Sequence, residues 1–308
     1  MWTYVFRRLL QTVPVLVGVA LIAFVFSELS GDPIRAMLGQ HTTPEIEAKV
    51  RAYYGLDKPR SERFLNYLGN LACGDLGLSI EKHGMPVNEI IAGGMHVTFL
   101  LTMGAILFAV LMGVSLGIAS ARRPNGIVDY GSSAVAAVGV SFPAFLLGML
   151  LMLLFAVQLG WLPVGGYERG QLKYLILPCL SLGMISTASI ARLTRNCIME
   201  ALNQDYVRSG RAKGLGEWQA LLGHALPNAL VPIITIIGAD FGSLLTGAVL
   251  TETVFALPGI GLQMANAIFA RDLPVVMGCC VVMALVFVTV NLLVDLSYAY
   301  LDPRIRYG

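Results

Sequence analysis

The sequence has few charged residues for its length. Asp, Glu, Lys and Arg make up 13% of its 308 residues and hydrophobic residues make up 56%. A soluble globular domain is nearer about 25% charged, so this composition excludes an ordinary soluble domain and predicts a membrane protein. The formal net charge of +2 is too small to predict a nucleic-acid-binding surface.

Motifs for nucleotide, metal and redox chemistry are also missing. No lysine follows a glycine in the G-x-x-x-x-G-K-[ST] pattern of a P-loop. The cysteines show no C-x-x-C or zinc-like spacing. The histidines show no metal-ligand spacing either; they are His41, His83, His96 and His224. We therefore expect no catalytic residue, metal or cofactor in this chain, so that any ATP and Mg²⁺ it depends on are bound by partner subunits.

Long apolar runs dominate what is present. Six of them are long enough to cross a hydrocarbon core of about 30 Å as helices, at roughly 20 residues each. They are Leu9–Phe26, Val97–Ser120, Ser132–Leu159, Tyr174–Ala191, Val231–Thr253 and Leu273–Tyr300. The first run is longer than the apolar region of a typical signal peptide and no A-x-A site follows it, which favours a retained span over a cleaved leader.

Basic residues are distributed unevenly among the short loops. With the N-terminus in the cytoplasm, the outer short loops hold only Arg169, Lys173 and Arg271. The cytoplasmic segments then hold Arg7, Arg8, Arg122, Arg123, Arg192, Arg195, Arg208, Arg211, Lys213, Arg304 and Arg306. Because cytoplasmic loops are enriched in Lys and Arg, this asymmetry predicts that both termini lie in the cytoplasm.

One loop, residues 30–96, is long and contains its own helical signals. Thr43 is a typical N-cap for a helix that begins at Pro44, and Gly55 is expected to end it. A second helix is expected from Ser61. The loop is too short and too poor in core residues for an independent domain, so we expect a small folded cap on the outer face.

The polar stretch Asp205–Pro227 interrupts the apolar second half of the chain. Its charges exclude a position in lipid, and its helical spacing predicts two short amphipathic helices joined by a glycine turn. The second helix is expected to end at Pro227. Gly214 is expected to take a positive φ in the turn, which other residues resist. Such a pair of helices at the cytoplasmic face is suited to binding another protein.

Three acidic residues lie in the predicted spans: Asp240, Glu252 and Asp295. Ionisable residues within a membrane often mark a functional site. Asp240 and Glu252 are twelve residues apart, roughly three turns, and are expected to share a helix face that lines a polar pathway. The alternative is a carboxylate hydrogen-bonded to a neighbouring helix. For Asp295 an interfacial role is expected.

Two further segments allow more than one interpretation. The G-x-S-x-G match at Gly113–Gly117 lies inside an apolar run, which favours helix packing through small residues over a nucleophile elbow. The connection Phe255–Asp272 is too apolar for an ordinary loop. It is predicted to be a re-entrant piece that gates the outer end of a pathway, or else a short interfacial helix. The candidate gate residues are Pro258, Gly259, Gly261, Arg271 and Asp272.

Together these motifs resemble a known family. Gly214 and Leu226-Pro227 match the EAA loop of ABC importer permeases, although Arg208-Ser209-Gly210 replaces EAA and His224 replaces an isoleucine. RSGRAKGL and HALPNAL instead resemble the peptide/nickel subgroup. The resemblance extends nearly end to end, through RRLLQTVPVLVGV, SGDP, YGLDKP, GDLGLSI, VSFPAFLLGMLL, LGWLPVGG, ILPCLSLG, ARLTR, TETVFALPGIG, RDLPVV and NLLVDLSYAYLDPRIRYG. The chain is similar to the permeases of the dipeptide/oligopeptide/nickel transport family.

The resemblance implies an all-α membrane protein of the bacterial inner membrane, with six transmembrane helices, the type I ABC importer permease fold and an N-in/C-in topology. It divides the chain into an N-terminal transmembrane helix at 1–29, a periplasmic loop subdomain at 30–96, a core permease domain at 97–301 with a coupling loop at about 200–228, and a cytoplasmic tail at 302–308. The ATPase-coupling residues that it implies are Tyr206, Arg208, Arg211, Ala212, Lys213, Gly214, Leu215 and Pro227.

The resemblance also implies a function and partners. The chain is expected to be a permease subunit, not itself an enzyme, that forms half of a pathway for di- or oligopeptides; glutathione-like compounds and nickel or nickel chelates are the alternative cargoes. The implied partners are a second homologous permease, two cytoplasmic ATP-binding subunits, a periplasmic or lipid-anchored substrate-binding protein and membrane lipid. A secondary transporter without ATPases and an intramembrane enzyme using Asp240 and Asp295 are the remote alternatives.

Overall fold

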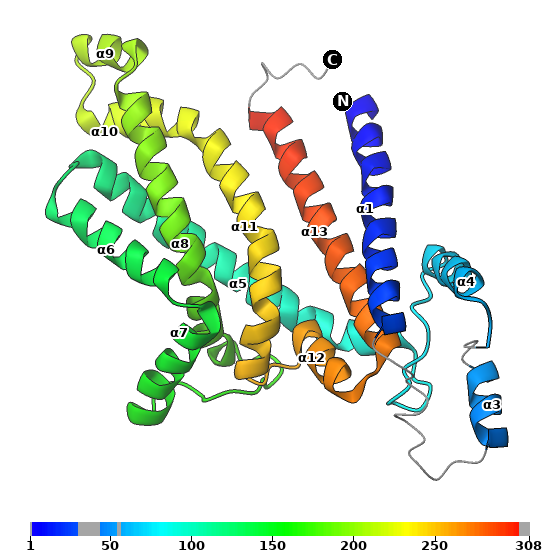
Figure 1. Ribbon diagram of the computed structural model, residues 1–308. Coiled ribbons are helices and arrows are strands. Elements are labelled where there is room, and N and C mark those ends of the chain that lie inside the picture. Colours follow the sequence, from blue (N-terminus) through cyan, green and yellow to red (C-terminus); the bar gives the residue numbers. More distant parts are fainter. Residues whose placement is uncertain (1, 30–43, 54–56, 302–308) are drawn as a thin grey trace. The chain divides into compact units, whose positions relative to one another are not determined.

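The computed structural model describes residues 2–29, 44–53 and 57–301 (Figure 1). Its elements in this part of the chain are α1 (Trp2–Leu29), α3 (Pro44–Tyr53), α4 (Arg60–Ala72), α5 (Val87–Arg122), α6 (Ile127–Ser141), α7 (Ala144–Leu151), η1 (Met152–Gln158), α8 (Lys173–Leu202), α9 (Asp205–Ala212), α10 (Glu217–Ala220), η2 (Leu221–Ala225), α11 (Leu226–Val254), α12 (Ile260–Ala270) and α13 (Leu273–Leu301). The all-α prediction is confirmed. The predicted cap at Thr43, the helix end at Gly55 and the tail 302–308 lie outside the described residues.

Five helices of the described chain are long and apolar enough to cross a membrane. They are Leu10–Leu29, Val87–Arg122, Lys173–Leu202, Glu217–Gly242 and Leu273–Leu296. The predicted continuous span Ser132–Leu159 is instead broken into α6, α7 and η1. Phe142 is extended at φ −107° and ψ 135° because the ring of Pro143 disfavours a helical conformation in the residue before it.

The helices form two compact units. One consists of residues 1–98 and 258–288, and the other of residues 99–257 and 289–308. The long helices α5 and α13 each contribute to both units. The boundary between the units therefore does not coincide with the ends of the predicted sequence segments.

In the first unit, the start of α5 packs with α12 and the start of α13. The buried core of this packing is Val87, Ile90, Ile91, Ile260, Ala267, Val275 and Cys279. Helix α4 contacts α1: the rings of Phe24 and Phe64 lie 5.3 Å apart, and Glu28 of α1 pairs with both Arg60 and Arg63 of α4. The two helices predicted in the long loop are confirmed as α3 and α4, and α4 is held against the end of the first span.

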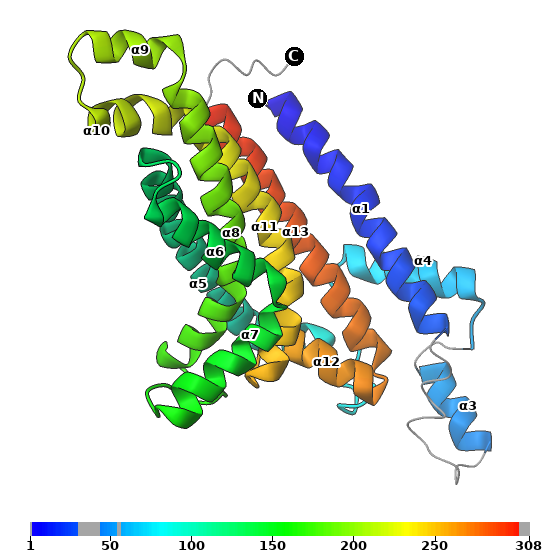
Figure 2. The same cartoon turned by 60° about the vertical axis from the view of Figure 1, so that its left-hand side comes forward.

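In the second unit, α8 is the central helix. It contacts α6, α7 and α11, and α8 and α11 run side by side in both cartoon views (Figures 1 and 2). Helix α5 also approaches α8 closely at Gly117: a Cβ there would lie 2.6 Å from Cβ of Thr194 and 2.7 Å from the carbonyl oxygen of Ala191. A Cβ at Gly113 would likewise lie 2.9 Å from Cβ of Ile190 in α8. The G-x-S-x-G match is therefore a helix-packing motif, as predicted.

The end of α11 is fixed by a large aromatic residue. Phe255 is almost completely buried, and its carbonyl oxygen accepts a 2.8 Å hydrogen bond from the backbone N–H of Gly166. A Cβ at Gly148 would lie 2.8 Å from the Phe255 ring, and one at Gly165 would lie 2.6 Å from the Phe255 carbonyl oxygen. The glycines let α7 and the loop before α8 close around this residue.

Candidate coupling loop and pathway residues

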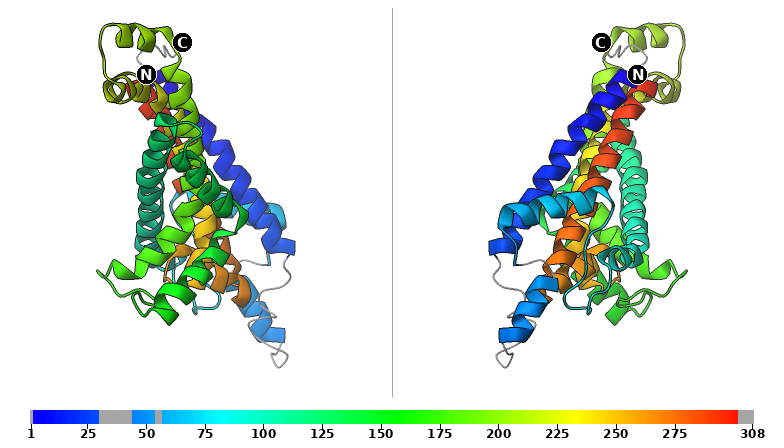
Figure 3. Two further views of the ribbon diagram at one scale, coloured as in Figure 1. Left: turned by 90° about the vertical axis from the view of Figure 1, so that its left-hand side faces the viewer. Right: turned by 90° about the vertical axis from the view of Figure 1, so that its right-hand side faces the viewer.

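The polar stretch predicted to bind a partner forms two short helices, α9 and α10, at one end of α8 and α11 (Figures 1 and 3). Between them Gly214 has φ +90°, which confirms the predicted positive φ. Its N–H donates to the Arg211 carbonyl oxygen at 3.0 Å, and the N–H of Leu215 donates to the Gly210 carbonyl oxygen at 3.2 Å. These bonds form a glycine-dependent C-cap that ends α9 and reverses the chain.

The surface of α9 is polar and exposed. Val207 is its one buried residue, whereas Tyr206 is 44% exposed and the side chains of Arg208 and Arg211 are exposed. Arg208 lies 3.9 Å from Asp205, and Nη2 of Arg211 lies 3.0 Å from Oε2 of Glu217 in α10. The turn itself presents further residues outward: Ala212, Lys213 and Gly214 are exposed, and Leu215 is half-buried. Seven of the eight residues assigned to coupling thus lie in α9 and the turn after it, and all but Leu215 are exposed, whereas Pro227 lies in α11.

The prediction that the second helix ends at Pro227 is wrong. Helix α10 continues through the π-helical segment η2 into α11, and Pro227 lies in the first turn of α11. Proline lacks an N–H, and the first turn of a helix is where that loss is tolerated. The π-helical segment η2, which is wider than an α-helix, directly precedes α11. Helix α10 and the membrane span α11 are therefore one continuous helical run.

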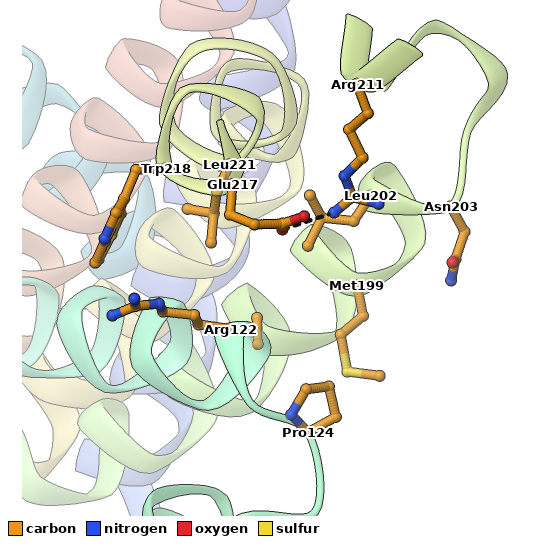
Figure 4. A pocket seen from close by; sticks show the side chains of 10 residues that line it. Arg122, Pro124, Met199, Leu202, Asn203, Arg211, Glu217, Trp218 and Leu221 are labelled. Atoms are coloured by element: carbon orange, nitrogen blue, oxygen red, sulfur yellow. Dashed lines mark hydrogen bonds and ion pairs between the residues drawn. The ribbon is translucent and has the colours of Figure 1, made fainter. Parts of the chain in front are cut away.

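This run is anchored to α5 and α8 by an apolar core. The core consists of Ala121, Ile198, Ala201, Leu221, Ala225, Ala229 and Ile233. Above it a pocket is open between the end of α5, the end of α8 and α10 (Figure 4). At this pocket the Arg122 guanidinium carbon lies 4.6 Å from the ring centroid of Trp218. Sequence reasoning did not identify this contact, because Arg122 and Trp218 lie nearly a hundred positions apart.

A second polar contact ties α6 to α8. Arg195 of α8 donates from Nε and Nη2 to the two carboxylate oxygens of Asp129, at 2.6 and 2.7 Å. The backbone N–H of Asn125 donates to the same carboxylate at 2.8 Å. The Arg195 hydrogen bonds, and then that of Asn125, hold the pKa of the Asp129 carboxyl below its ordinary value. Sequence reasoning did not identify this pair, although both residues flank predicted spans.

The pathway candidates do not occupy equivalent positions. Asp240 is half-buried in α11 beside Ser186 of α8, whereas Glu252 is fully buried. Twelve residues correspond to about three and a third turns, so the two side chains point in different directions and the expected shared face is not present. One carboxylate oxygen of Asp240 is buried without a hydrogen-bond partner in the described part of the chain. The Ser186 side chain of the neighbouring helix α8 hydrogen-bonds this carboxylate, which matches the alternative interpretation, and the pathway role of Asp240 stays a prediction.

The candidate gate segment contains the apolar helix α12. Gly259 is the buried N-cap of this helix, and a Cβ at Gly94 of α5 would lie 2.7 Å from the Gly259 carbonyl carbon. Gly261 is buried in its first turn, whereas Pro258 is exposed. At its other end Arg271 is exposed with φ 58°, and Asp272 is 1% exposed. The five candidates thus lie at the two ends of one short helix.

Solved structures show the class of fold to which this arrangement belongs. An amino acid ABC transporter aligns with a TM-score of 0.54 over 68% of this chain and 92% of that chain, at 18% identity. The MetNI methionine ABC transporter, in an inward-facing form, aligns with a TM-score of 0.56 over 69% of this chain and 96% of that chain, at 19% identity. The fold is that of an ABC importer permease.

Sequence comparison identifies the family. The chain belongs to the binding-protein-dependent transport system inner membrane component family, whose model matches residues 113–307, while the model of its N-terminal region matches residues 1–87. Full-length relatives include the dipeptide transport system permease protein DppB of Alkalihalophilus pseudofirmus at 40% identity over 334 residues, and the oligopeptide transport system permease protein AppB of Bacillus subtilis at 36% over 316. The glutathione transport system permease protein GsiC of Salmonella choleraesuis is 41% identical over 308 residues. Each alignment covers 100% of both chains.

Proposed function

We propose that this inner-membrane chain is a permease subunit of an ATP-driven importer and forms half of its translocation pathway. The observation that carries this proposal is the continuous run from α10 into α11, which is preceded by the exposed helix α9 and the Gly214 turn. An exposed polar helix that is rigidly joined to a membrane helix is suited to transmit a partner's movement into the membrane. ATP and Mg²⁺ are bound by the partner subunits.

The proposed orientation places α9 and α10 in the cytoplasm. In the second unit, Arg122, Arg195 and the basic residues of α9 lie on the segments joined at this end of α8. Such a concentration of Arg and Lys beside membrane helices is typical of the cytoplasmic side. The topology is therefore N-in and C-in, with the broken helix α6–α7 as the third of six crossings.

The proposed partners include a cytoplasmic ATPase, a second permease and a substrate-binding protein. The exposed faces of α9 and the turn dock on a cytoplasmic ATPase, as an amphipathic helix docks in a groove. A second, homologous permease pairs with this chain to complete the pathway, and each permease rests on one ATPase. A substrate-binding protein delivers the cargo from the outer side.

Di- and oligopeptides are the proposed cargo, supported by the names of two full-length relatives. Glutathione is the second candidate because the glutathione permease is as similar to this chain as the dipeptide permease is. Both cargoes are peptide-like and carry at least one carboxylate and one amine. A pathway containing Asp240 is compatible with the ammonium group of either.

The test is purification of the tagged chain in gentle detergent from its native membrane, followed by mass spectrometry of proteins and small molecules. Two ATPases, a sister permease and a binding protein loaded with peptides are expected. Reconstituted vesicles then take up a labelled dipeptide in the presence of ATP and the binding protein. Uptake of glutathione but not of dipeptides would transfer the assignment to the second candidate. Recovery of the chain without an ATPase would overturn the proposed function.

A further inference from the structure

A tight hairpin precedes the long helix α5. Residues 77–87, here called the outer hairpin, are closed by backbone hydrogen bonds from Val87 N–H to the Gly77 carbonyl oxygen at 3.0 Å and from Ser79 N–H to the Met85 carbonyl oxygen at 2.9 Å. Leu78 and Pro86 form an isolated antiparallel β-bridge between its two arms. At its tip the hairpin is exposed, while Ser79 and Ile80 at its base are buried.

Asp272 holds the base of this hairpin from a position far along the chain. Its carboxylate accepts hydrogen bonds from the Ser79 hydroxyl, from the backbone N–H of Ile80 at 3.1 Å and from the backbone N–H of Glu81 at 3.2 Å. The Ser79 hydroxyl oxygen in turn accepts from the N–H of Lys82 at 2.9 Å. A carboxylate that is 1% exposed is tolerated because these donors replace the lost water.

The backbone of Asp272 lies between two helices. Its N–H donates to the Ala267 carbonyl oxygen in α12 at 2.8 Å, and its carbonyl oxygen accepts from Val276 N–H in α13 at 3.1 Å. Arg271, directly before it, has φ 58°. One residue therefore joins the outer hairpin, the end of α12 and the start of α13.

The tip of the hairpin has the properties of a preorganised contact surface. Glu81, Lys82 and His83 are exposed there, and Met85 is 43% exposed. His83 has φ 53°, in the left-handed region that is uncommon for residues with a side chain, and its Nδ1 lies 2.9 Å from the Glu81 carbonyl oxygen. Lys82 Nζ donates to Gln263 Oε1 of α12 at 3.3 Å. A rigid surface loses little conformational entropy when a partner binds it.

We infer that the outer hairpin is a docking surface for the substrate-binding protein and that Asp272 is the positioning residue that builds this surface and ties it to α13. This inference rests on the proposed function, which puts the hairpin on the side from which the binding protein arrives. The partner is chosen over a second copy of the chain because the family is one of binding-protein-dependent transport. Docking on the tip then acts on α12 and α13 through the buried carboxylate of Asp272, and on α12 also through Lys82.

The test uses the complete importer in lipid nanodiscs with its own binding protein. Two quantities are measured for each variant: the Kd of the binding protein, and the ratio of ATP hydrolysis with and without it. The tip variant is Glu81→Ala combined with Met85→Ala, and the positioning variants are Asp272→Ala and Asp272→Asn. Lys58→Ala is the matched control, because Lys58 is an exposed residue of the same long loop and pairs with Glu62 at 2.9 Å.

We expect the tip variant to raise the Kd about tenfold, the size of effect that marks an energetically important interface residue. Asp272→Ala should raise the Kd to a similar extent, and Asp272→Asn less, because the amide keeps one acceptor oxygen. Combining the tip variant with Asp272→Ala should give less than the product of the two effects, since both act through the same surface. Lys58→Ala should bind as the wild type does.

Wild-type binding by the tip variant would overturn the inference, as would weakened binding in Asp272→Ala alone. The tip variant leaves the Asp272 hydrogen bonds in place, so it tests the surface even where Asp272→Ala does not fold. A wild-type importer that neither binds the binding protein nor responds to it would instead contradict the proposed function. The two failures are therefore distinguishable.

Discussion

The guanidinium group of Arg122 lies over the indole ring of Trp218, with its central carbon 4.6 Å from the ring centroid (Figure 4). This contact joins the end of α5 to α10, on the helical run that leads into α11. Beside it, the apolar core that includes Ala121, Ile198 and Leu221 joins α5, α8 and η2. The segment α10–η2 is thus in contact with α5 and α8 and is continuous with α11.

Removing the contact between Arg122 and Trp218 is expected to weaken the coupling between ATP hydrolysis and transport. A cation–π contact at an exposed site contributes about 0.5–1 kcal/mol, so Trp218→Ala and Arg122→Ala should each lower the amount of substrate moved per ATP by a few-fold. The double variant should move as much substrate per ATP as the more affected single variant, because both substitutions remove the same contact. Trp218→Phe keeps an aromatic face and exposed Arg123→Ala spares the contact, so both should resemble the wild type. Equal losses of transport and ATP hydrolysis in the single variants would contradict the prediction.

Replacing Gly214 with a bulky residue is expected to abolish transport without preventing insertion, and smaller replacements are expected to reduce transport. A Cβ at Gly214 meets nothing within 4 Å, so the penalty comes from φ +90° alone, about 1–2 kcal/mol for most residues. Asn tolerates this region better than Ala or Val, so uptake should decrease in the order Gly214, Asn, Ala, Val. Gly223→Ala is the control because Gly223 also has open space but no positive φ. Uptake in vesicles and the amount of inserted protein are measured; normal uptake by Gly214→Val would count against the coupling role.

The Asp129–Arg195 pair is expected to stabilise the protein at neutral pH and to lose this effect only in acid. The pKa of Asp129 is lowered in the folded protein, so folding favours the ionised carboxylate. Its contribution is complete above the ordinary pKa of 3.8 and is lost as the pH falls through the lower, folded pKa. Asp129→Asn should therefore lower the Tm by a similar amount at pH 8 and pH 5. A difference in Tm that vanishes already between those two values would refute this assignment.

The contact of α5 with α8 is expected to be sensitive to a single methyl group. In Gly117→Ala the new Cβ would lie 2.6 Å from Cβ of Thr194, so the helices must separate, at about 1–3 kcal/mol for such overpacking. Gly131→Ala in α6 is the control: nothing lies within 4 Å of its Cβ. Thermal unfolding in detergent should show a lower Tm for the first variant and an unchanged or higher Tm for the second. Equal Tm values for the two variants would mean that α5 and α8 do not pack through Gly117.

Local features of the sequence predicted much of the fold. Five of the six apolar runs fall in long helices, Pro44 and Ser61 lie at the starts of α3 and α4, and the polar stretch contains two helices with Gly214 in the left-handed region. These features depend on neighbours within a few residues, where helical periodicity and turn preferences operate. Two local predictions that failed involve proline: Pro143 breaks a span, and Pro227 lies within the helical run from α10 into α11 that it was expected to end. A third, the helix face shared by Asp240 and Glu252, failed because twelve residues are not a whole number of turns.

The sequence by itself determined that this chain is a helical membrane protein with a polar, glycine-turned surface for a partner, because composition, periodicity and φ preferences are local properties. Only the tertiary structure decided which polar groups meet. Asp129 and Arg195 are 66 positions apart, and Asp272 and Ser79 are 193 apart. Such pairs depend on how the chain packs. The sequence around each of these residues contains no local signal that identifies its partner. For the same reason the sequence indicated Asp272 as a gate residue but gave no sign of the hairpin that it holds.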